Sequence, residues 1–272
     1  MNEPRLQILL TNDDGIGSPG LWAAAESLSR LGYVTVVAPR EQWTGAGRSM
    51  PITSDGSIRE EQVTVGGKSW KVYAVGGTPA QVVQHAVLEL LPRRPDLVVA
   101  GINYGENVTV GVTMSGTVGA ALEAAAFGIP SLAISLQTDS SFFHTHSDEI
   151  DFAAAAHFAA YFGRMLLKVP RTPDVDLLKV DIPADATPET PWKLTRLSRT
   201  IYYHPEVPDR SVPGAVRRIG YRVAVDHKGL EPDSDVYALR VDGCVSVTPV
   251  SLDLTSRVEL ASLESRIRAA IR

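Results

Sequence analysis

The chain has 272 residues, 44% of them hydrophobic and 21% charged, so it is long enough to bury a sizeable core. Its net charge of -5 disfavours a broad binding surface for nucleic acid or an anionic membrane, because both partners reward clustered Lys and Arg. The single cysteine, Cys244, excludes an intramolecular disulfide framework and a cysteine-rich zinc site.

The sequence carries no apolar run of the roughly 18 residues that a membrane-spanning helix needs. Its start, MNEPRLQILLTNDDG, has acidic residues and a turn where a signal peptide would be apolar. We therefore expect a cytoplasmic protein that binds a small molecule and has neither a nucleic-acid polymer nor a membrane as its partner.

The first third of the chain alternates between strand and helix patterns. Residues 6–11 form a short apolar run and residues 34–38 a β-branched one, which is typical of buried parallel strands. Between them, Ser18 as cap and Pro19 at the first position open a helical pattern that stops at Gly32. This order predicts a βαβ unit.

The alternation is interrupted once and then resumes. Strand-like stretches around Gly66-Gly67 predict a hairpin inserted at about residues 50–75. The remaining alternation favours a Rossmann-like, mostly parallel sheet with helices on both faces. The further expected elements are helices at about 79–91, 117–127 and 147–168, and strands at 96–100, 131–135 and 176–181.

The last third of the chain has a different pattern. Residues 183–213 are rich in Pro and Thr. We expect strands near 218–226, 236–241 and 244–250 and a closing helix at about 256–271. The sequence thus predicts a Rossmann-like catalytic core over residues 1–182 and a β-rich extension with a C-terminal helix over residues 183–272, together one unit.

A first candidate site follows the first strand, where residues 11–15 read TNDDG. Ligands of open α/β sheets collect at this carboxyl edge. The adjacent carboxylates Asp13 and Asp14 repel each other unless a cation or proton compensates, and their hard oxygens suit Mg²⁺, Mn²⁺ or Ca²⁺. A capped tight turn explains the same residues equally well. The glycines of residues 15–20 lead into a helix N-terminus, which attracts phosphate, although they match no nucleotide-binding fingerprint.

Three more polar loops follow later strands. Residues 39–49 can supply a hydroxyl ligand and basic groups such as Arg48, or simply form a flexible connection. Asn103 can offer its carbonyl oxygen to a hard cation, although an asparagine alone is more often a turn residue. Residues 114–120 (MSGTVGA) open a helix as an anion cradle or as an ordinary cap. Because these loops meet at one sheet edge, together they favour a site for metal and phosphate.

The histidines add little to this hypothesis. His144 and His146 form an HxH pair in a polar stretch that we interpret as a loop, without a recognisably spaced third ligand. The chain also lacks the GxSxG elbow of serine hydrolases.

The ordered motifs NDDG, TGAGRS, GGTP, GINYG and SGTVGAALEA resemble the SurE family, the survival-protein nucleotidases. The stretches SDVYA (residues 234–238) and GCVSVTP (residues 243–249) resemble its closing segment. The resemblance implies a homodimer or homotetramer, with the extension used in oligomerisation. It also implies hydrolysis of nucleoside 5′- or 3′-monophosphates, and of short polyphosphate, with one divalent cation per subunit, Mg²⁺, Mn²⁺ or Co²⁺.

The resemblance also implies roles for individual residues. The metal ligands would be Asp13, Asp14, Thr44 and Asn103. The phosphate would be held by Ser115, Gly116 and Thr117, with Arg48 as an electrostatic aid. Asp13, Asp14 and Asn12 would carry the catalysis, by activating water or by a carboxylate acting as nucleophile or base.

The chain departs from the family pattern at several positions. Arg40 replaces an acidic residue, Thr44 a serine, Trp43 a polar residue and Gln81 an aspartate. Threonine keeps the hydroxyl of serine. The other changes leave open an alternative, in which the protein binds or senses a phosphorylated ligand with weak or no turnover.

Overall fold

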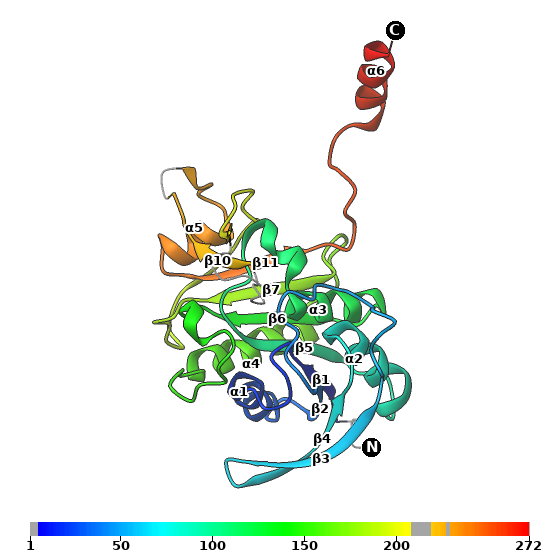
Figure 1. The fold of residues 1–272 in the computed structure, drawn as a ribbon, viewed down its shortest axis with the longest axis vertical. Coiled ribbons are helices and arrows are strands. Elements are labelled where there is room, and N and C mark those ends of the chain that lie inside the picture. The colour runs from blue at the N-terminus through cyan, green and yellow to red at the C-terminus, as the bar shows by residue number, and fades with distance from the viewer. Residues whose placement is uncertain (1–4, 208–218, 227–228, 272) are drawn as a thin grey trace, which may run out of the picture.

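The computed structural model describes residues 5–207, 219–226 and 229–271. These residues form one nine-stranded sheet of order β3-β4-β2-β1-β5-β6-β7-β11-β8 and a two-stranded sheet of β9 and β10 (Figure 1). The strands are β1 (Gln7–Thr11), β2 (Tyr33–Pro39), β3 (Ile58–Val65), β4 (Lys68–Val75), β5 (Leu97–Tyr104), β6 (Ser131–Leu136), β7 (Leu177–Ile182), β8 (Trp192–Leu194), β9 (Tyr203–Glu206), β10 (Gly220–Val223) and β11 (Val245–Val250). The α-helices are α1 (Pro19–Leu28), α2 (Pro79–His85), α3 (Gly116–Ala126), α4 (Ala153–Lys168), α5 (Asp235–Arg240) and α6 (Leu260–Ala270). Shorter helical segments are η1 (Ala86–Leu90), η2 (Thr109–Met114) and η3 (Ser140–Phe142).

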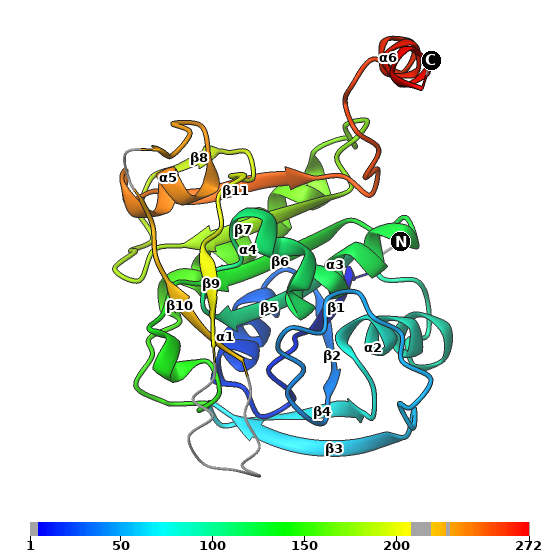
Figure 2. The same cartoon turned by 45° about the horizontal axis from the view of Figure 1, so that its top comes forward.

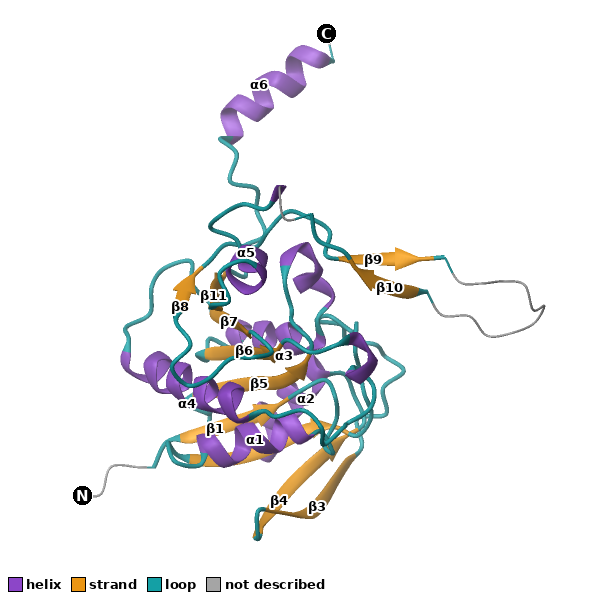
Figure 3. Ribbon diagram, turned by 90° about the vertical axis from the view of Figure 1, so that its left-hand side faces the viewer, coloured by secondary structure: helices purple, strands orange, loops and turns teal. Residues whose placement is uncertain are grey.

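Helices cover both faces of the main sheet. α1 and α4 lie on one face and α2 and α3 on the other (Figure 3). Successive residues of β1 alternate between the two cores, since Ile8 and Leu10 pack with α1 and α4, whereas Leu9 packs with α2 and α3. The predicted mostly parallel α/β fold is confirmed.

The first βαβ unit forms as predicted, with one difference in its cap. Pro19 occupies the first turn of α1, and Ser18 precedes it, but the Ser18 side chain accepts no capping hydrogen bond. A Cβ on Gly20 would lie 2.3 Å from the carbonyl oxygen of Ile102. Only glycine therefore allows α1 to pack this closely on β5.

The predicted hairpin is part of the main sheet. β3 and β4 pair antiparallel about Gly66-Gly67, and β4 also pairs parallel with β2 (Figure 2). The hairpin therefore extends one edge of the sheet.

Two predicted elements were wrong in type or extent. The expected strand at 236–241 is helix α5, because Ser234 caps it by accepting from the Tyr237 N–H and because Val236 and Leu239 face the same small core. The expected helix at 147–168 begins only at Ala153, where the Asp151 side chain accepts the N–H of Ala153.

The C-terminal third contributes to both sheets. β11 pairs antiparallel with β7 and parallel with β8, so these strands extend the main sheet, whereas β9 and β10 form an antiparallel pair of their own. Residue 218, where a strand was expected to begin, lies outside the described residues. Helix α6 projects from the rest of the chain (Figure 1) and has no buried residue. Across the described ranges we find no helix that is both long and apolar enough to cross a membrane.

Candidate metal and phosphate site

The loops after β1 and β2 meet the N-terminus of α3 at the carboxyl edge of the sheet. The N–H of Trp43 donates to the carbonyl of Asp13 at 2.7 Å, and the N–H of Gly47 donates to the carbonyl of Met114 at 2.9 Å. The hydroxyl of Thr117 donates to Oδ1 of Asp13. The structure thus brings three of the four predicted loops together around one aspartate.

The two adjacent carboxylates are almost completely buried, with Asp13 3% and Asp14 2% exposed. Burial raises the pKa of Asp13 to about 6, although the Thr117 hydroxyl opposes this effect. Burial, followed by repulsion from Asp13, raises the pKa of Asp14 well above its usual range. A cation shared by the two groups would allow both to ionise near neutral pH.

Helix α3 begins against this pair. The Ser115 hydroxyl accepts the N–H of Val118 at 3.1 Å and caps the helix. A Cβ on Gly116 would lie 2.7 Å from the Cβ of Asp13, so a larger residue would push the turn away from the carboxylate. The first turn of α3 therefore lies beside the candidate metal ligands, with its Thr117 N–H directed to Asp13 and its Val118 N–H to Ser115.

Of the two remaining predicted ligand residues, Asn103 presents an oxygen that suits a hard cation. Asn103 donates through Nδ2 to the carbonyls of Tyr104 and Gly105, so its Oδ1 is oriented by the backbone and makes no hydrogen bond to the described residues. The N–H of Tyr104 faces Oδ2 of Asp14 at 3.4 Å, which puts the end of β5 beside that carboxylate. Thr44 lies exposed in the neighbouring loop.

Carboxylate, amide and hydroxyl oxygens form the kind of donor set that Mg²⁺ or Mn²⁺ prefers. Within the described part of the chain, no three His, Cys, Asp or Glu side chains form a cluster that could hold a metal ion. A metal bound here would therefore be held by two carboxylates and neutral oxygens, a donor set unlike that of a zinc centre.

Comparison with known proteins shows the family to which the chain belongs. The family described as Survival protein SurE matches residues 8–204. The chain belongs to the SurE family. A Thermococcus gammatolerans protein named 5′-nucleotidase SurE is 41% identical over 262 residues, or 96% of this chain and 95% of that protein. An Archaeoglobus fulgidus protein of the same name is 42% identical over 261 residues, or 95% of this chain and 96% of that protein.

A solved SurE structure has the same fold. The crystal structure of the SurE protein from Aquifex aeolicus matches with a TM-score of 0.74 at 30% identity, over 98% of this chain and 100% of that one. The resemblance drawn from the motifs is thereby confirmed.

Two predicted residues of this SurE chain are engaged within the protein. The side chain of Asn12 makes two hydrogen bonds to the backbone of Gly15 and so holds the turn that presents the aspartates. Arg48 forms an ion pair with Glu123 of α3 at 2.7 Å. Their contacts fix the loops, and a direct role on phosphate stays a prediction for both.

The sequence did not reveal that Gln42 and His146 contact Asp14 and that His144 contacts Gln42. Gln42 donates to Oδ1 of Asp14 at 3.2 Å and to the carbonyl of Phe143 at 2.6 Å. His144 donates through Nδ1 to Gln42, and His146 donates through Nε2 to the carbonyl of Asp14 at 2.7 Å. The HxH spacing was the only available signal, and it gave no indication that this loop lies against the site.

The departures from the SurE pattern have local explanations. Arg40 contacts the side chains of Asp55 and Ser57 at 2.8 and 2.6 Å. Gln81 forms a reciprocal capping box with Thr78 at the start of α2. The T-x-x-Q spacing carries that signal in the sequence.

Proposed function

We propose that this SurE chain is a divalent-metal-dependent phosphomonoesterase that hydrolyses nucleoside 5′-monophosphates to nucleoside and phosphate. The observation that carries the proposal is the buried pair Asp13 and Asp14, held against the N-terminus of α3. Relatives about 40% identical over nearly the whole chain and named 5′-nucleotidase SurE support the substrate class. Nucleoside 3′-monophosphates and short polyphosphate are further proposed substrates.

In this proposal Asp13, Asp14, Asn103 and Thr44 hold one cation, Mg²⁺, Mn²⁺ or Co²⁺. When bound, the cation neutralises charge on the phosphoryl oxygens and acidifies the attacking water. The ionised pair of aspartates supplies the negative charge that retains it.

The protein's own groups bind and orient the phosphate. The N–H of Gly116 comes before the first hydrogen-bonded turn of α3 and can donate to a phosphoryl oxygen, whereas the N–H of Thr117 is directed to the Asp13 carboxylate. The Thr117 hydroxyl holds Asp13 in one orientation, which keeps the carboxylate in place for the cation. The dipole of α3 favours the negative charge that develops on the phosphoryl group.

We also propose a homodimer or homotetramer located in the cytoplasm. Helix α6 supports the oligomer, because Leu260, Ile267 and Ile271 are 64, 51 and 81% exposed and lie on one side of a helix without buried residues. A second copy of the chain would cover that apolar stripe.

The decisive experiment measures phosphate release from nucleoside 5′- and 3′-monophosphates, sugar phosphates and polyphosphate, with Mg²⁺, Mn²⁺ and Co²⁺ compared and a chelator as control. We expect metal-dependent release from nucleoside monophosphates and its loss in Asp13→Asn. Nucleotide binding without release under every metal would instead favour the phospho-ligand binding alternative, and full activity of Asp13→Asn would refute the site assignment.

A further inference from the structure

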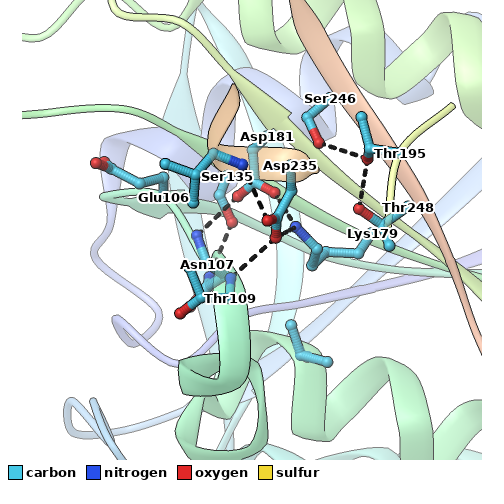
Figure 4. Close-up of polar contacts among 12 residues, drawn as sticks. Glu106, Asn107, Thr109, Ser135, Lys179, Asp181, Thr195, Asp235, Ser246 and Thr248 are labelled. Atoms are coloured by element: carbon cyan, nitrogen blue, oxygen red, sulfur yellow. Dashed lines mark hydrogen bonds and ion pairs between the residues drawn. The ribbon is translucent and has the colours of Figure 1, made fainter. Parts of the chain in front are cut away.

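A second group of buried charges lies on the α3 face of the sheet. Lys179 of β7 contacts Asp181 of the same strand and Asp235 at the start of α5, and all three side chains are 0% exposed (Figure 4). Lys179 and Asp181 are two residues apart on a strand, so they point to the same face. The proposed reaction uses none of these residues.

Both carboxylates bind the backbone of one loop. We call residues 105–109, which follow β5 and include the first residue of η2, the connecting loop. Oδ1 of Asp181 accepts the N–H of Asn107 at 2.7 Å, and Oδ2 of Asp235 accepts the N–H of Thr109 at 2.9 Å. Nδ2 of Asn107 donates to the Ser135 hydroxyl of β6 at 2.8 Å (Figure 4). These hydrogen bonds fasten the loop to β6, β7 and α5, together with those from the Gly105 N–H to the carbonyl of Leu136 and from Arg240 to Glu106.

The conformation of the connecting loop needs such fastening. Thr109 has φ of 60°, in the left-handed region that β-branched residues rarely adopt. A residue in such a conformation is strained and persists only where the surroundings hold it. The hydrogen bond from its N–H to Asp235 is one such restraint.

Burying the three charges of this cluster costs free energy, which argues against a role in stability alone. Burial raises the pKa of Asp181 to about 6, even though Lys179 opposes this effect. Burial by itself would lower the pKa of Lys179, but the two carboxylates outweigh it and raise that pKa. Buried ion pairs often contribute less to stability than apolar residues of the same volume, so their value lies in fixing geometry.

The connecting loop joins the two halves of the candidate site. Asn103 lies two residues before it, and η2 leads from it to Ser115, the residue that follows Met114. We propose that Lys179, Asp181 and Asp235 are positioning residues, which fix the connecting loop and so set the place of the Asn103 ligand relative to the phosphate-binding turn of Ser115. This inference rests on the proposed function of that site.

The test compares three variants of the full chain. Asp181→Leu removes the acceptor of the Asn107 N–H and leaves Lys179 and Asp235 as an oppositely charged pair. Asp181→Asn keeps an oxygen for that N–H. Thr195→Val is the matched control, because the buried Thr195 hydroxyl bonds Ser246 and Thr248 at 2.9 and 2.8 Å in the same sheet (Figure 4) and touches no part of the connecting loop through an observed hydrogen bond.

Each variant is studied by four measurements. These are hydrogen exchange of the peptide spanning residues 104–115, Mn²⁺ affinity by calorimetry, steady-state kinetics (kcat and KM) with a nucleoside 5′-monophosphate at saturating metal, and Tm. For Asp181→Leu we expect faster hydrogen exchange and a kcat that falls by a larger factor than KM rises. We also expect the Mn²⁺ Kd to rise about 10- to 100-fold, because changes in residues that orient metal ligands have effects of this size. Asp181→Asn should restore much of each value. Thr195→Val should lower Tm and leave the other three quantities unchanged.

Wild-type exchange and Mn²⁺ affinity in Asp181→Leu would overturn the inference, as would equal losses in Thr195→Val at equal Tm. If Asp181→Leu does not fold, Ser135→Ala, which removes the acceptor of the Asn107 amide, replaces it under the same two criteria. Exchange and Mn²⁺ binding are independent of the substrate. A wild-type protein that releases no phosphate would therefore refute the proposed function. Hydrogen exchange and Mn²⁺ affinity would still test the inference about the connecting loop.

Discussion

At Asp13, burial and hydrogen bonding act in opposite directions on one carboxylate. The structure places the group 3% exposed, between the Thr117 hydroxyl and the charge of Asp14. Desolvation is the largest of these effects and raises the pKa of Asp13 from 3.8 to about 6. The ionised pair is therefore unfavourable in the metal-free protein and becomes favourable when a cation is bound.

This shift predicts a pH-dependent stability of the chelated protein. Asp13 binds its proton more tightly in the folded than in the unfolded protein, so protonation of Asp13 stabilises the fold. This contribution to the free energy of unfolding is complete below pH 3.8 and is lost as the pH rises through about 6. Asp13→Asn cannot ionise and also relieves the repulsion on Asp14. We expect its Tm in chelator to exceed that of the wild type at about pH 7.5 and the difference to shrink at about pH 4.5.

Thermal melts with chelator at the two pH values check this expectation, and a Tm difference that does not change with pH would contradict it. Added Mn²⁺ is the control. It should raise the Tm of the wild type at the higher pH and leave Asp13→Asn unchanged, because only the ionised pair retains the metal.

Gln42 is expected to strengthen Mn²⁺ binding by the same pair, because it donates a hydrogen bond to Asp14. Gln42→Leu removes a donor to Asp14 and the link to the loop of residues 140–147. Hydrogen bonds to charged groups contribute about 1.5–3 kcal/mol, so we expect the Mn²⁺ Kd to rise about 10-fold or more. His144→Ala, which loses a contact to Gln42 but none to Asp14, serves as the comparison in calorimetry. Equal Mn²⁺ affinities in the two variants would argue against a role for Gln42.

Among the secondary-structure elements, α2 and α5 are determined by their first residues. Thr78 and Gln81 exchange hydrogen bonds at the start of α2, and Gln81 also donates to the carbonyl of Pro51 at 3.1 Å. At α5, the cap by Ser234 outweighs the strand-like composition of the residues that follow it. Short helices of this kind depend on capping because they have few internal hydrogen bonds.

Gln81→Ala is therefore expected to destabilise the protein through α2. Loss of a cap costs about 1 kcal/mol, and for a chain of this size that corresponds to a Tm lower by about 2–4 °C. Gln81→Glu keeps an oxygen for the Thr78 N–H and should lie closer to the wild type. Calorimetric melts measure both variants. A Tm for Gln81→Ala equal to that of the wild type would show that the capping box contributes nothing.

On the scale of the whole molecule, helix α6 stands out because it buries no residue against the rest of the described chain. It follows an extended segment after β11, projects from the body (Figures 1 and 2) and carries Leu260, Leu263, Ile267 and Ile271 at helical spacing. An apolar stripe in that position is typical of a subunit contact.

We expect Leu263→Asp combined with Ile267→Asp to lower the mass measured by light scattering to that of a single chain, because charges would replace the apolar contacts. Ser265→Asp, on the opposite side of α6, is the matched control and should keep the wild-type mass. A double variant that keeps the wild-type mass would exclude α6 from the interface.

The sequence by itself determined the βαβ order and the strands β1, β2, β6 and β7. It also determined the motifs around Asp13, Asn103 and Ser115. These features could be predicted because hydrophobic periodicity, turn residues and helix caps are local properties of the sequence. It failed at residues 236–241, where a strand-like composition concealed a capped helix. It also did not show that β11 and β8 join the main sheet, since strand pairing depends on contacts far apart in sequence. Only the tertiary structure decided that Thr117 bonds Asp13, that Gln42 reaches Asp14 and that Lys179 lies between two buried aspartates. These contacts join residues separated by up to about a hundred positions, and their energies arise from burial, which local sequence does not encode.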